Sequence, residues 1–115
     1  MTTGLTMTES RSGGVCIVSL TGRIDSSNAA DFTTHLNRLI SSGQKSILLD
    51  FANVLYLTSA AFRALLVATD EADRQTARLV LCSLATQVRD LFEMGGLLDV
   101  FTILASRDEA LARFG

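Results

Sequence analysis

The sequence has few of the residues from which metal centres are built. It contains one histidine and two cysteines among 115 residues, and they are not spaced as metal ligands. Zinc sites need several cysteine or histidine ligands, and calcium or magnesium sites need grouped oxygen ligands. We therefore expect no metal and no cofactor. Cys16 and Cys82 lie in apolar, strand-like runs and are interpreted as small buried hydrophobic residues.

Long apolar runs and blocks of charge are also missing. No run approaches the roughly 18 apolar residues that a membrane-spanning helix requires, and the first six residues lack the basic start and apolar core of a secretory signal. Ten basic and twelve acidic residues give a net charge of -2 and are dispersed, so no nucleic-acid-binding surface is indicated. The chain is expected to be cytoplasmic, with proteins or small ligands as partners.

The common nucleotide-binding and hydrolase motifs are absent as well. Neither G-x-x-x-x-G-K-[ST] nor G-x-G-x-x-G occurs, so the usual phosphate-binding loops are excluded. Ser59 is flanked by Thr58 and Ala60 instead of lying in a G-x-S-x-G elbow, and only His35 could serve as its base. His35 falls on the polar side of a predicted helix and is expected to be exposed to solvent. We expect that the protein is not an enzyme; labelling by a reactive serine probe would favour the alternative, a nucleophile at Ser59.

The residues that are present indicate one globular domain. Hydrophobic residues make up 48% of the chain and charged residues 19%, which is typical of a compact protein with a single core. Strand spacing and helical spacing alternate through the second half, which predicts a mixed sheet with crossover helices. The first two strands should form a hairpin across two glycines. We predict an α/β domain over residues 4–114, with strands at 5–9, 15–20, 46–51, 54–57, 79–82 and 100–104 and helices at 27–42, 59–75, 84–94 and 106–114. Ser83 is predicted to cap the third helix, and a capping box at 106–109 is predicted to open the fourth.

The change from strand to helical spacing at Thr58 and Ser59 is the most informative feature. From Phe62 onward apolar residues recur every three or four positions, which places Ser59 where a helix N-cap is expected. One interpretation is an ordinary capping serine that satisfies free backbone N–H groups. The other is a modification switch, since a phosphate on Ser59 would meet the positive end of the helix, and Arg63 lies one turn later on the same face. Val67, an apolar residue among charged ones, is a candidate for a contact surface.

Three segments, by their order and spacing, resemble the STAS domain, the family that includes the bacterial anti-sigma factor antagonists. They are L-T-G-R-I-D at 20–25, the strand, loop and helix at 48–66, and the late helix and its stop at 88–97. The resemblance implies a single STAS-like domain over nearly the whole chain. In the phosphorylated members, the serine after the leading residue of the switch loop accepts the phosphate, and Ser59 occupies that position here. Thr58 replaces the leading aspartate and is a competing acceptor, and Ala61 replaces a glycine.

The resemblance also implies a function. Such an antagonist binds a serine-kinase-type anti-sigma factor through its switch loop and central helix, displaces a sigma factor, and is inactivated when the kinase phosphorylates it. ATP and magnesium belong to that kinase. In the alternative, the domain is an unmodified scaffold subunit of a stress-signalling complex or of an ABC-type lipid-transport complex, and a homodimer is compatible with either. The residues implied to bind the partner are Asp25, Thr58, Ser59, Ala60, Arg63 and Val67, with Ser59 as the phosphorylation site.

Overall fold

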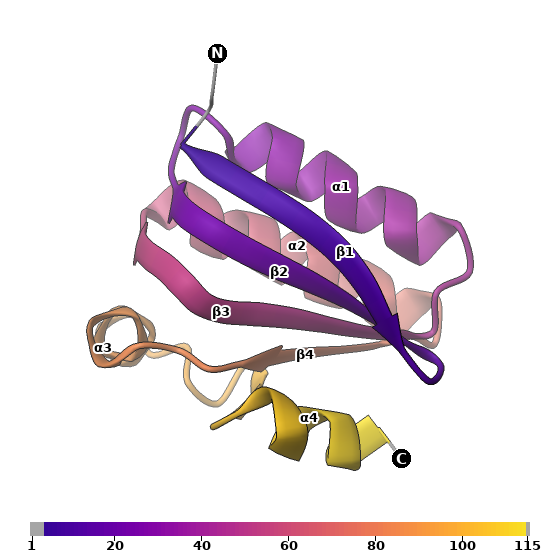
Figure 1. The fold of residues 1–115 in the computed structure, drawn as a ribbon. Coiled ribbons are helices and arrows are strands. Elements are labelled where there is room, and N and C mark those ends of the chain that lie inside the picture. Colours follow the sequence, from indigo (N-terminus) through magenta and orange to yellow (C-terminus); the bar gives the residue numbers. More distant parts are fainter. Residues whose placement is uncertain (1–3, 115) are drawn as a thin grey trace.

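The fold is organised around a five-stranded sheet, whose strands follow the order β1-β2-β3-β4-β5. Figure 1 shows β1 to β4 side by side in this order. The computed structural model describes residues 4–114. Helices connect β2 to β3, β3 to β4 and β4 to β5, and a further helix follows β5. The elements are β1 (Leu5–Ser12), β2 (Val15–Ile24), α1 (Ala29–Ser41), β3 (Ser46–Leu57), α2 (Ser59–Arg74), β4 (Arg78–Cys82), α3 (Thr86–Met94), β5 (Thr102–Leu104) and α4 (Arg107–Phe114).

The strand directions follow from the connections. Gly13 and Gly14 join β1 to β2, which pair antiparallel as a hairpin, and Gly13 has a φ of +58°, a conformation that favours glycine. The pairs β2 with β3, β3 with β4 and β4 with β5 are parallel, because a helix returns the chain between the strands of each pair. The predicted mixed sheet with crossover helices is confirmed.

The helices cover both faces of the sheet. α1 and α2 lie on one face and α4 lies on the other (Figure 1). The larger core, beneath α1 and α2, includes the fully buried side chains of Phe32, Phe51 and Leu65. Both cysteines are buried, as predicted, and burial raises the pKa of each thiol. The smaller core, on the α4 side, consists of Val15, Ile17, Leu48, Val80, Cys82 and Ala110.

Some boundaries differ from the sequence prediction. α1 and β5 each begin two residues later than predicted. α3 begins at Thr86, because Ser83 has a left-handed backbone conformation, with φ +64°, and its N–H donates to the carbonyl of Leu104. Ser83 therefore extends the pairing of β4 with β5, and the prediction that it caps α3 is wrong.

His35 is not the solvent-exposed residue that the sequence predicted. Its side chain is 16% exposed, and its Nε2 lies 2.7 Å from Oε2 of Glu9. Nη2 of Arg38 lies 3.2 Å from the other ring nitrogen and 3.4 Å from the Glu9 carboxylate. Glu9 belongs to β1, far from His35 in sequence, so these contacts tie α1 to the edge of the sheet.

A buried carboxylate holds α4 against the sheet. Asp50 of β3 is 8% exposed, and its Oδ2 accepts hydrogen bonds from Nε (2.9 Å) and Nη2 (2.8 Å) of Arg107, the first residue of α4. The same guanidinium donates to Oγ of Ser19 in β2 at 2.9 Å. α4 begins with the cap that the sequence predicted, since Oγ of Ser106 accepts from the N–H of Glu109 at 3.1 Å.

Candidate functional site

The ends of β2 and β3 bring two of the predicted segments together. Ile24 pairs with Leu57 at the end of the parallel ladder, and the N–H of Thr58 donates to the carbonyl of Ile24 at 3.0 Å. β2 leads into the loop that contains Asp25, and β3 leads into α2. Because the carboxyl ends of parallel strands lie at one edge of a sheet, Asp25 and Ser59 share the same end of the molecule.

Ser59 is the first residue of α2. The sequence predicted Ser59 as the N-cap of this helix, and that prediction is wrong by one residue. The N-cap is Thr58, whose backbone is extended (φ −101°, ψ 175°) and whose carbonyl accepts from the N–H groups of Ala61 and Phe62. That carbonyl begins the hydrogen bonding of the helix, as an N-cap carbonyl does. Ser59 is exposed and lies in the first turn, where the helix dipole favours negative charge.

The two neighbouring hydroxyl groups differ in accessibility. Oγ1 of Thr58 is buried and has no hydrogen-bond partner among residues 4–114, and the Thr58 side chain makes no capping bond to α2. Ser59, by contrast, is exposed. Ser59 is therefore the more accessible of the two residues to another molecule.

Three other predicted residues border a shallow groove between α1 and α2. Ala60, Arg63 and Val67 line it from α2, and the guanidinium of Arg63 makes no hydrogen bond or ion pair within the described part of the chain. Ser59, Arg63 and Val67 follow one another at four-residue steps, so they share one side of the helix. Val67 is 45% exposed. The opposite wall and the floor of the groove consist of Ala29, Ala30, Thr33 and Ala64.

Asp25 organises the loop between β2 and α1. Its Oδ1 accepts hydrogen bonds from the N–H (2.9 Å) and Oγ (2.5 Å) of Ser27, and its backbone carbonyl accepts from the N–H of Ala29 at 2.9 Å. The Ser27 hydroxyl, followed by the Ser27 N–H, lowers the pKa of the Asp25 carboxyl. The carboxylate thus has a structural role in the turn that starts α1.

Sequence reasoning missed two residues that hold this loop in place. Asn28 is fully buried; its Oδ1 accepts from the N–H of Asp25 and its Nδ2 donates to the carbonyl of Arg23, both at 2.9 Å. Gly22 has a φ of +112°, and a Cβ at this position would overlap the carbonyl oxygen of Gly4. The glycine within a strand was a readable signal of close backbone approach. The burial of Asn28 depends on tertiary packing and had no such signal.

Sequence reasoning also missed the exposure of two apolar residues just before Ser59. Leu55 is 62% exposed and Tyr56 is 48% exposed, although both belong to an apolar run that resembled a buried strand. They lie on β3 at the same end of the sheet as Ser59.

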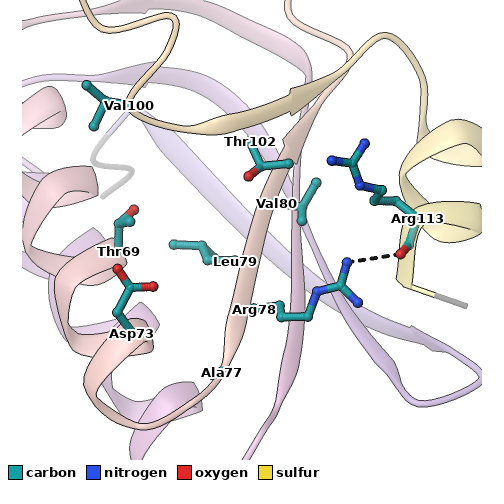
Figure 2. Close-up of a pocket in the computed structure, with 9 residues that line it drawn as sticks. All are labelled: Thr69, Asp73, Ala77, Arg78, Leu79, Val80, Val100, Thr102 and Arg113. Carbon is teal, nitrogen blue, oxygen red and sulfur yellow. Dashed lines mark hydrogen bonds between the residues drawn. The ribbon is translucent and has the colours of Figure 1, made fainter.

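A second hollow lies at the opposite end of the sheet, where Arg78 of β4 pairs with Ser46 of β3 (Figure 2). Thr69 and Asp73 of α2 line one side, and Arg78 and Arg113 line the other. The Nη2 of Arg78 donates to the carbonyl of Arg113 at 2.9 Å. None of the predicted site residues lines this hollow.

Within residues 4–114, no group of three or more histidine, cysteine, aspartate or glutamate side chains could hold a metal ion. None of the helices there is both long enough and apolar enough to cross a membrane.

Comparison with known families classifies the chain. The model of the STAS domain matches residues 7–110. This chain belongs to the STAS domain family. The chain is also similar to BtrV of Bordetella bronchiseptica, a proposed anti-sigma factor antagonist. It is 32% identical over 108 residues, which cover 94% of this chain and 93% of BtrV.

Solved structures show the same STAS fold. An anti-sigma factor antagonist from Mycobacterium paratuberculosis superposes with a TM-score of 0.85 at 20% identity, covering 95% of this chain and 92% of that one. SpoIIAA, a Bacillus cell fate determinant and anti-sigma factor antagonist, superposes in its unphosphorylated form with a TM-score of 0.79 at 19% identity, covering 95% and 96%. Its phosphorylated form gives 0.72 at 18% identity, covering 96% and 100%. At these identities the likeness establishes the architecture.

Proposed function

We propose that this STAS domain is an anti-sigma factor antagonist that is switched off by phosphorylation of Ser59. The observation that carries the proposal is an exposed serine in the first turn of α2, next to a threonine whose hydroxyl is buried. Similarity to BtrV and to the solved antagonists supports the same role. STAS domains of this kind are regulatory. In the proposed reaction this chain supplies the acceptor hydroxyl, and a cytoplasmic serine-kinase-type anti-sigma factor supplies the ATP and magnesium chemistry.

The unphosphorylated surface suits a partner that accepts a neutral hydroxyl. Ser59, Ala60 and Val67 offer small and apolar side chains, and Arg63 adds one positive charge beside the groove between α1 and α2. Asp25 lies at the same end of the sheet, with its carboxylate held by Ser27. The partner would therefore contact both the β2–α1 loop and the first turns of α2.

A phosphate on Ser59 would change this surface without unfolding it. It adds a charge of about -2 at neutral pH. Near a helix N-terminus such a charge is stabilising by about 0.3–1 kcal/mol, so α2 should persist. When the partner docks, the phosphate must lose bound water or is repelled by like charge on the partner. Either effect weakens the complex.

Phosphate mapping tests the proposal. The purified protein is incubated with the serine-kinase-type anti-sigma factor of the same organism and Mg-ATP, and the phosphate is located by mass spectrometry. We expect modification of Ser59, none of Thr58, and none in Ser59→Ala. Ser59→Ala should still bind the kinase, and Ser59→Glu should not. The absence of both binding and modification in the wild type would refute the proposal.

A further inference from the structure

The core-facing residues of β3 change their spacing along the strand. Ile47, Leu49 and Phe51 are buried at two-residue steps, and Val54 and Leu57 follow at three-residue steps. In a regular strand every second side chain points to the same face. Each three-residue step therefore leaves two consecutive side chains outside the larger core.

Two β-bulges produce the change. Between Asp50 and Asn53, β3 advances three residues while β2 advances two, and between Val54 and Tyr56, β3 advances two residues while β2 advances one. Each bulge thus places an extra residue on β3. Bulges redirect side chains and are over-represented next to functional sites.

The second bulge exposes Leu55 and Tyr56 together. Without it, strand alternation after Val54 would turn Tyr56 toward the core. β4 pairs only with Ser46–Asp50, so it does not cover this part of β3. The two side chains remain 62% and 48% exposed, although burial of such large apolar groups would favour stability.

We propose that Leu55 and Tyr56 are an apolar anchor for the anti-sigma factor that acts on Ser59; this inference rests on the proposed function. Their position favours the anti-sigma factor as the protein that contacts them. They precede Ser59 by four and three residues at the same end of the sheet, and a protein that closes around the Ser59 hydroxyl must cover the adjoining chain. Tyrosine is enriched among the residues that dominate binding energies, and such residues are effective where the partner excludes water.

Binding measurements with matched variants test the anchor. The dissociation constant for the unphosphorylated protein and the anti-sigma factor is measured by calorimetry for the wild type, Leu55→Ser and Tyr56→Ser. The control is Val100→Ser, because Val100 is 47% exposed and lines the hollow at the opposite end of the sheet. Each anchor variant should bind at least about tenfold more weakly, and the control should bind like the wild type. Circular dichroism and urea unfolding verify that all variants are folded.

The outcomes separate the anchor from the switch. If Ser59→Glu abolishes binding while Leu55→Ser and Tyr56→Ser bind like the wild type, the anchor is refuted and the proposed function stands. If the wild type does not bind, both are refuted. If the wild type self-associates and both substitutions dissolve that assembly without weakening kinase binding, the pair is a contact between two copies of the chain and the anchor is again refuted.

Discussion

Loss of Arg107 should destabilise the fold more than its partial exposure suggests. Arg107 is 40% exposed, but its partner Asp50 is only 10% exposed at the side chain. In Arg107→Met, the carboxylate would lose both guanidinium donors and keep the hydrogen bond from the N–H of Ala52 at 2.9 Å. Removing one member of a buried ion pair costs about 3–5 kcal/mol. Because solvent reaches the Arg107 side, we expect a smaller loss of about 2–3 kcal/mol.

Urea unfolding monitored by circular dichroism measures this loss. The matched control is Arg74→Met, which removes a guanidinium that bonds to Asp70 and Glu71 at the surface, at 3.1 and 3.0 Å. Arg74 and Asp70 are 65% and 67% exposed, so the control should cost less than about 0.5 kcal/mol. The slope against urea should match the wild type in both variants, since neither changes the surface exposed on unfolding by much.

A double variant distinguishes the stability lost through an unpaired buried charge from the stability lost through poorer packing. Asp50→Asn keeps an acceptor for the Ala52 N–H and removes the charge, so Asp50→Asn in the Arg107→Met background should recover much of the lost stability. The reasoning is refuted if Arg107→Met costs no more than the Arg74 control. It is also refuted if the second substitution recovers nothing.

Three further substitutions test the local geometry. Ser27→Ala should raise the pKa of Asp25 toward its ordinary 3.8, measured by NMR titration. In the wild type the lowered pKa stabilises the fold above about pH 3.8, and this contribution is lost as the pH falls through the lowered value. The difference in the free energy of unfolding between wild type and variant should therefore shrink in acid. Gly22→Ala should lower the free energy of unfolding by at least about 2 kcal/mol, whereas Gly14→Ala, which has open space and no positive φ, should change it by less than about 1 kcal/mol. Thr58→Val removes a buried hydroxyl without a partner and should leave urea stability unchanged or raise it by about 1 kcal/mol; a clear loss would show that the hydroxyl is bonded.

The features predicted correctly from sequence are those that local chemistry specifies. The hairpin required only two glycines between two apolar strands, and the Ser106 cap required only the spacing of a capping box. Burial of the cysteines followed from their apolar neighbours. The position of Ser59 at the start of α2 was predicted to within one residue, because the change of hydrophobic period marks a junction but not which residue supplies the N-cap carbonyl.

The features that were missed depend on partners distant in sequence. Glu9 and His35 meet only because β1 lies beside α1, and Asp50 meets Arg107 only because α4 packs against the sheet. The bulges of β3 arise from its register with β2, so no pattern within β3 alone distinguishes Tyr56, which is exposed, from Leu57, which is buried. The apolar run therefore predicted the strand correctly, but it did not show which of its residues are exposed.

The charge of residues 51–69 indicates why one phosphate on Ser59 would be a strong signal. Arg63 is the only charged side chain within residues 51–69, and it makes no ion pair within residues 4–114. A phosphate of about -2 would change the net charge of this segment from +1 to about -1. A partner surface complementary to one positive charge and two apolar side chains would then face a negative one, and like charges brought together at an interface cost several kcal/mol. Since the N-terminus of α2 would itself stabilise the phosphate, phosphorylation under the proposed function should dissociate the complex and leave the domain folded.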